Sequence, residues 1–203
     1  MINEQKDLIM TICIWFSRLA ILNLLIILST IIGGIIFGIG PAVSTALVIL
    51  KQWKDGKDVP LISYYFKVYK ELFVSSNRIM LFGGPLLTLI GFDAYYMVGL
   101  NGPLSTIGFM IFIYLLLVIS LTLLYSLSSS SRHFTKVNAI LKNSLVDIFL
   151  FPKQSLTILS GLLIVGFLSI KWNVLFIFFT WSLILLIVVL TRDTISFKDG
   201  KQT

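Results

Sequence analysis

The residues of this chain that could do chemistry are few. Its one histidine, His133, stands beside Arg132 at the end of an apolar run. A metal site with several histidines cannot be built from a single imidazole, and a Ser-His-Asp triad is not expected around a histidine that stands at a span end beside Arg132. The sequence also lacks a glycine-rich phosphate loop followed by Lys-Ser/Thr, so this chain is not expected to hydrolyse ATP. We therefore expect no enzyme activity, no catalytic residue, no metal site and no cofactor.

Two charged residues lie inside apolar runs. Arg18 stands in WFSRLAIL and Asp93 in LIGFDAYYM. Charges within the bilayer are costly and are usually paired or functional. We expect Arg18 and Asp93 to be structural and to pair with each other if both lie toward the same leaflet. The alternative is a transport or proton-relay role, which usually needs more titratable groups than one.

The composition is that of an integral membrane protein. Of the 203 residues, 57% are hydrophobic and only 12% are charged, and the mean hydropathy is +0.98. Soluble domains carry about 25% charged residues, which keep their surface hydrated. With Cys13 as the only cysteine, no internal disulfide can form.

The first apolar segment is too long for one crossing. Residues 19–50 carry no charge, and one helix of that length would measure about 48 Å against a hydrocarbon core of about 30 Å. The segment should break at Gly38, Gly40 and Pro41, with Pro41 in the first turn of a new helix over 41–54. That helix is predicted to be half-buried at the membrane face; the alternative is a tight hairpin that crosses back.

Gly34 and Gly38 form the one G-x-x-x-G pattern of the sequence. Two glycines at this spacing favour close helix packing in membranes. The other interpretation is that they belong to the helix break itself. Gly34, Gly38, Gly40 and Pro41 are therefore the structural or packing candidates of this segment.

The fold class predicted from these patterns is an all-α integral membrane protein, one membrane domain over residues 1–203. It has about five transmembrane helices, or six if the glycine break is a hairpin. The spans are expected at about 15–37, 79–97, 104–127, 154–170 and 173–190. Besides the helix at 41–54, two cytoplasmic amphipathic helices are expected to lie in the interface at about 61–77 and 132–151.

The helix predicted over 61–77 has an aromatic face and a lysine face. Phe66, Tyr69 and Phe73 recur at helical spacing, and Lys67 and Lys70 lie opposite them. This pattern fits a helix in the interface plane. It also fits a helix docked on a partner, so these five residues are the partner-facing candidates.

The Lys and Arg distribution predicts the orientation. The 51–78 connection holds six of these residues, the 131–153 connection four and the C-terminal tail three, whereas the 98–103 turn holds none. By the positive-inside rule, the two lysine-rich connections and the C-terminus are expected in the cytoplasm of a multi-pass cell-membrane protein. The N-terminus would lie outside with five crossings and inside with six.

Along the chain, WFSRLAILNLLIILSTIIGGIIFGIGPAVSTAL is followed by the basic turn KQWKDGKD, the helix YYFKVYKELF and a proline-containing span with an aspartate. This order resembles the YesL-like family of bacterial integral membrane proteins. The resemblance covers essentially the whole chain and is specific in about the first 80 residues. Its most typical element is G-x-G-P-A-x-x-x-A-L, which here comprises Gly38, Gly40, Pro41, Ala42, Ala46 and Leu47. The family is a domain of unknown function, and it offers no catalytic residue to carry over.

The resemblance also implies a role. Members of the family tend to be encoded beside carbohydrate ABC importers and glycan-degrading enzymes. This implies a non-catalytic accessory subunit of a carbohydrate (oligosaccharide) importer that packs against its permease subunits. The expected partners are those permease subunits and membrane lipid, with no nucleic acid.

The alternative function is an independent small membrane transporter or channel. Against it stands the scarcity of polar residues that could line a pore, chiefly Asn23, Asp93 and scattered Ser and Thr. A membrane enzyme or sensor is disfavoured by the missing acid-base residues. Copurification with permease subunits would distinguish the accessory subunit from both.

Overall fold

The chain folds entirely into helices. The computed structural model describes residues 2–100, 102–129 and 137–199, and no strand occurs among them. The expected all-α membrane fold is thereby confirmed. The helices are α1 (Ile2–Ile32), α2 (Ile36–Lys54), α3 (Leu61–Val98), α4 (Pro103–Ser129), α5 (Val137–Leu150), α6 (Pro152–Lys171), α7 (Asn173–Phe178) and α8 (Thr180–Asp199).

Five described helices are long and apolar enough to cross a membrane: α1 over Met10–Ile32, α2, α3, α4 and α6. The expected number of five spanning helices is confirmed, but one of the five differs from the segment that the sequence predicts. The span expected at 173–190 is divided at Phe179 into α7 and α8. The apolar part of α8, Thr180–Arg192, has fewer than the roughly 20 residues that a crossing needs. Its place among the five is taken by α2.

The break in the first apolar segment lies earlier than expected. The helix ends at Ile32 and restarts at Ile36, so Gly38, Gly40 and Pro41 all lie inside α2. The prediction that Pro41 occupies the first turn of a helix over 41–54 is therefore wrong. The glycine pair at 33–34 breaks the chain first, because it can adopt the backbone conformation that ends a helix.

Helix α3 joins two elements that the hydropathy pattern separates. The amphipathic helix expected at 61–77 and the span expected at 79–97 form one helix of 38 residues. The pattern changes near Arg78, but neither glycine nor proline interrupts the backbone there. The described part of the other predicted amphipathic helix, 132–151, forms α5; residues 132–136, with Arg132 and His133, lie outside the described residues.

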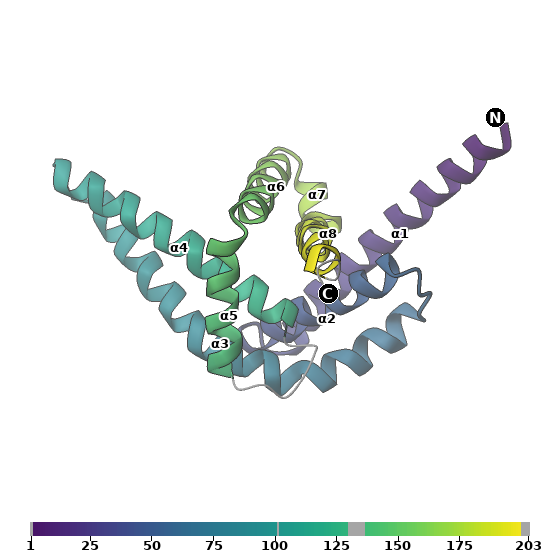
Figure 1. The fold of residues 1–203 in the computed structure, drawn as a ribbon, viewed down its shortest axis with the longest axis horizontal. Helices are drawn as coiled ribbons and strands as arrows, with labels where there is room; N and C mark the ends of the chain where they lie inside the picture. Colours follow the sequence, from purple (N-terminus) through teal and green to yellow (C-terminus); the bar gives the residue numbers. More distant parts are fainter. Residues whose placement is uncertain (1, 101, 130–136, 200–203) are drawn as a thin grey trace.

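The helices are arranged in two arms with a central group between them (Figure 1). One arm contains α1, α2 and the first part of α3; the other is the antiparallel hairpin of the end of α3 with α4, and α5–α8 lie between. The core is centred on α2, which packs against α1, α3, α4 and α8. Within the apolar windows, 67% of α2 is buried, against 17–28% of α1, α3, α4 and α6. The chain itself thus covers α2 and leaves the other apolar helices exposed.

Candidate functional site

The turn between α1 and α2 is closed by its own backbone. The amide of Ile35 donates to the carbonyl of Thr30 (2.9 Å) and that of Gly34 to Ile31 (3.0 Å). This is a Schellman motif with Gly34 (φ +77°) in the left-handed position that glycine favours. The amide of Ile36 then donates to the Gly34 carbonyl (2.8 Å) across Ile35, whose φ of 61° and ψ of −71° define a strained γ-turn.

Close packing behind this turn depends on other glycines. A Cβ on Gly33 would lie 2.5 Å from both the Gly38 Cα and the Tyr69 hydroxyl, and a Cβ on Gly38 would overlap the Thr30 backbone. A Cβ on Gly40 would lie 2.8 Å from the Met80 side chain of α3. Gly38 and Gly40 are therefore packing residues within the chain, whereas open space surrounds the position of a Cβ on Gly34.

Hydroxyl groups join α1, α2 and α3. The fully buried Tyr65 shares a hydrogen bond of 2.7 Å with the Ser29 hydroxyl, and the Tyr69 hydroxyl donates to the Ser29 carbonyl (3.0 Å). On the next turns, Ser76 of α3 donates to Ser44 of α2 (2.8 Å). These hydrogen bonds fix the positions of α1 and α2 along α3, which apolar packing alone would not fix.

The five partner-facing candidates differ in how far their side chains are exposed. Tyr69 is buried inside the chain, and Phe66 and Phe73 are half-buried against the core. The aromatic face thus packs on α1 and α2, so the prediction that Tyr69 faces a partner is wrong. Lys67 and Lys70 are exposed on the opposite side of α3.

Arg18 pairs with Asp58, not with Asp93. Its guanidinium donates to the Asp58 carboxylate at 2.6 Å and lies 5.6 Å from the centre of the Trp53 ring. The predicted pair with Asp93 is wrong because the α1–α2 hairpin brings Arg18 to the connection after α2. Asp93 is half-buried near the end of α3 and has no hydrogen-bond or ion-pair partner among the described residues.

Asn23 joins α1 to the last two helices. It is fully buried; its amide donates to the Ile177 carbonyl (2.6 Å) and its oxygen accepts from the Ser182 amide (3.0 Å). The oxygen thereby caps the first turn of α8, whose early amides have no partner inside the helix. A single amide within an uncharged run was the only sequence signal, and it gave no indication of a partner more than 150 positions away.

A second arginine contact joins α8 to α4 and α5. Arg192 donates to the Tyr125 carbonyl of α4 (2.7 Å) and to the Asp147 carboxylate of α5 (3.1 Å). Its guanidinium also lies 4.7 Å from the centre of the Tyr125 ring. In the sequence Arg192 is one of three basic residues of the C-terminal tail, and nothing there signals a contact with α5, 45 positions away.

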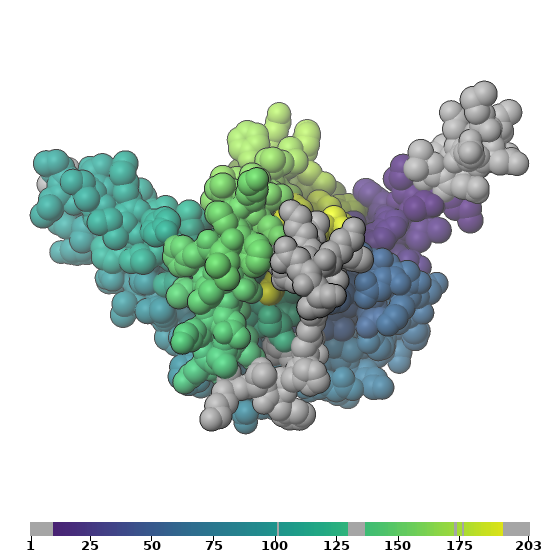
Figure 2. All heavy atoms as spheres, in the orientation of Figure 1, coloured from purple at the N-terminus to yellow at the C-terminus, as the bar shows by residue number. Residues whose placement is uncertain are grey.

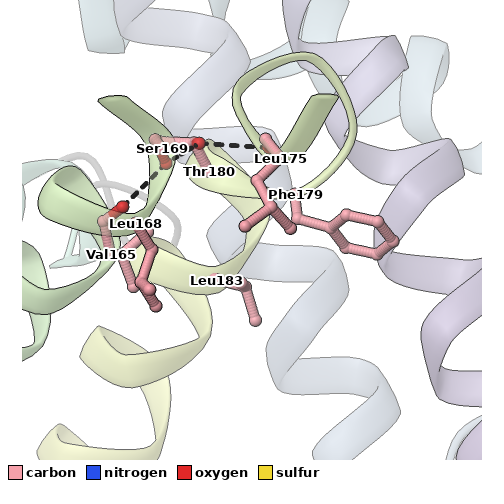
Figure 3. A pocket seen from close by; sticks show the side chains of 7 residues that line it. All are labelled: Val165, Leu168, Ser169, Leu175, Phe179, Thr180 and Leu183. Atoms are coloured by element: carbon pink, nitrogen blue, oxygen red, sulfur yellow. Dashed lines mark hydrogen bonds between the residues drawn. The ribbon is translucent and has the colours of Figure 1, made fainter. Parts of the chain in front are cut away.

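A small cavity lies between α6 and the α7–α8 segment (Figure 3). Its volume is about 30 Å³, and Ser169 and Thr180 join hydroxyls across it at 2.5 Å. Small-molecule sites usually enclose some 300 Å³ or more, so this cavity does not hold a sugar. Among the residues that the structure describes, no group of three His, Cys, Asp or Glu side chains could hold a metal ion.

Comparison with known proteins now assigns the family. The family described as "Protein of unknown function, DUF624" matches residues 19–94. These residues run from α1 through the α1–α2 turn and α2 almost to the end of α3. Relatives in Bacillus subtilis (strain 168) include YesL, 27% identical over 93% of this chain and 89% of its own length. YteU, from the same strain, is 31% identical over 85% of this chain and 78% of its own length.

A third relative in that strain, YesV, is 34% identical over 39% of this chain and 38% of its own length. All three are described as uncharacterized proteins. No solved structure gives a significant match. On the strength of these relatives and of the shared α1–α3 segment, the chain belongs to the YesL-like family, DUF624.

Proposed function

We propose that this chain is a non-catalytic subunit of a membrane complex and that its partners are the permease subunits of a bacterial carbohydrate ABC importer. The importer assignment rests on the resemblance to the YesL-like family. The structural support is the α3–α4 arm, an apolar hairpin that projects away from the rest of the chain (Figure 2).

The arm has a surface suited to another membrane helix. Leu89, Phe92, Leu104 and Met110 are each at least 61% exposed on it. Lipid can cover such side chains, but lipid provides no partner for Asp93, which lies on the same arm without one in the described chain. A carboxylate near an apolar surface favours a protein that offers it a donor.

The interior gives less support to an independent transporter. The buried polar side chains that a substrate path would need are largely used between helices, as in the contacts of Asn23, of Ser29 with Tyr65, and of Ser169 with Thr180. A group that already holds two helices together cannot bind a passing substrate without breaking that contact.

Copurification tests the proposal. A tagged chain extracted in mild detergent should bring permease subunits with it, and Leu89→Ala with Phe92→Ala should abolish this because it removes the arm's apolar contacts. Leu163→Ala with Phe167→Ala on α6 is the matched control, since those side chains are equally exposed (64% and 71% against 61% and 69%). A purified chain that moves a sugar into liposomes by itself would contradict the proposal.

A further inference from the structure

The outside of the α1–α2 turn is apolar. Ile31, Ile32, Ile35, Ile36 and Phe37 are each 56–75% exposed. Turns that face water are usually built from Gly, Pro, Asn, Asp and Ser, and a contiguous exposed apolar patch marks contact with lipid or protein. The surroundings of this turn are therefore not water.

The turn also needs little water for its backbone. The amides of Gly33, Gly34, Ile35 and Ile36 all donate to carbonyls within residues 29–34. Irregular backbone is excluded from hydrocarbon chiefly because its polar groups lack partners there. For these four amides that objection does not hold, since the Schellman motif and the γ-turn pair them internally.

The first arm has one apolar side and one charged side. Exposed apolar side chains follow α1 from Met10 through Leu28 to the turn. On the opposite side, the first part of α3 exposes a charged stripe, which we define as Lys67, Lys70, Glu71 and Arg78. Helix α2 packs extensively against both α1 and α3, whereas α1 and α3 share few contacts, which include the hydrogen bonds of Tyr65 and Tyr69 with Ser29. Helix α2 therefore lies largely between them.

The charged stripe lies at the level of the turn. Tyr69 lies between Lys67 and Lys70 on α3, and its hydroxyl donates to the Ser29 carbonyl. Ser29 stands only four residues before Gly33, where the turn begins. A hairpin that crossed fully along the bilayer normal would carry Lys67 and Lys70 to the far side, against the positive-inside rule. An upright hairpin whose turn stopped within the bilayer would place them in hydrocarbon, which is costly. A hairpin that enters at a slant, with α1 toward lipid and the stripe toward water, avoids this cost.

We propose that α1 and α2 form a re-entrant hairpin whose isoleucine-rich turn inserts among lipid acyl chains and returns to the side of entry without crossing the membrane. Arg18 fits this placement, because it turns away from lipid toward Asp58, whose side chain is 82% exposed. The N-terminus and the 55–60 connection then lie on the same side of the membrane. This placement does not depend on the proposed importer partner.

Single cysteines in a Cys13→Ser background test the hairpin. Ile36→Cys marks the turn, Lys57→Cys the water side and Leu163→Cys an exposed position on the apolar helix α6. In intact cells and inverted vesicles, an impermeant maleimide should label Lys57→Cys from one side and Ile36→Cys from neither. An N-terminal tag should be accessible from the same side as position 57.

A spin label on the purified variants in phospholipid vesicles then identifies what covers the turn. The label on Ile36→Cys should collide with oxygen and not with a water-soluble nickel complex, as on Leu163→Cys. Ile32→Cys repeats the measurement if Ile36→Cys folds poorly.

Three results would overturn the hairpin. Labelling of position 36 from the side opposite position 57 would indicate a full crossing. Exposure to nickel in pure lipid would mean that a missing protein normally covers the turn, and shielding from both oxygen and nickel would mean burial against another copy of the chain.

Discussion

Single polar residues in the interior of this chain hold helices in register. Asn23 joins α1 to α7 and α8, and the Ser29 hydroxyl joins α1 to α3. Between lipid-facing helices, apolar side chains prefer a neighbouring helix hardly more than lipid, so packing and hydrogen bonds decide which helices meet. The few amides and hydroxyls of the core therefore carry more of the fold's specificity than their number suggests.

Replacing Asn23 with leucine should destabilise the protein. The substitution keeps the branched shape of the side chain but leaves the Ile177 carbonyl and the Ser182 amide unpaired in a buried site. The expected loss is about 1–3 kcal/mol, the cost of unsatisfied buried polar groups. Thermal unfolding in detergent measures it, with the half-exposed Leu24→Ala as the control on the same helix. An unchanged midpoint would mean that the Asn23 contacts contribute nothing.

At the scale of elements, contacts between segments that are distant in the sequence hold the central group, α5–α8, together. Arg192 of α8 contacts the Tyr125 carbonyl on α4 and the Asp147 carboxylate on α5. Without these contacts, α5 would be held chiefly by its packing on α4 and by its covalent link to α6. Arg192 thus connects α8 to two helices that lie far before it in the sequence, with its contacts 67 and 45 positions away.

Replacing Arg192 with glutamine should loosen α5. The shorter neutral side chain cannot keep both contacts, and hydrogen bonds to charged groups contribute about 1.5–3 kcal/mol each. Limited proteolysis should cut α5 faster in Arg192→Gln than in the native chain. Arg78→Gln, an exposed arginine of α3, serves as the charge-matched control; equal cleavage of the two variants would refute the role of Arg192.

At the scale of the whole molecule, the Lys and Arg distribution predicts the orientation in the membrane. Lys57 lies exposed in the connection that precedes α3, and Leu100 lies exposed in the turn between α3 and α4. The second half of α3, from Ile79 to Val98, measures about 30 Å and therefore matches one bilayer crossing. The two connections should consequently lie on opposite sides.

An impermeant thiol reagent checks this orientation. In a Cys13→Ser background, Lys57→Cys should resist labelling in intact cells and react in inverted vesicles, and Leu100→Cys should do the reverse. Labelling of Lys57→Cys in intact cells would show that the lysine-rich connection is outside. Labelling of both from one side would show that α3 does not cross.

The sequence alone determined the class of protein and most of its elements. The uncharged run over 19–50 requires a membrane and a break in the helix, and the helices follow because each apolar segment must satisfy its backbone internally in lipid. The break was expected at Gly38–Pro41, yet it lies at Gly33–Ile35. Several glycines allowed either position; with the break at Gly33–Ile35, Gly33 lies against Tyr69 and Gly38 against Thr30, close approaches that only glycine permits.

Tertiary structure decided how the residues are paired. Arg18 and Asp93 were both recognised as costly charges, but only the fold placed Arg18 beside Asp58. The aromatic face of Phe66, Tyr69 and Phe73 was equally suited to lipid, to a partner and to the chain's own core, and packing on α1 and α2 chose the core. Periodicity shows which side of a helix is apolar, whereas the surface that covers that side depends on helices from distant parts of the sequence.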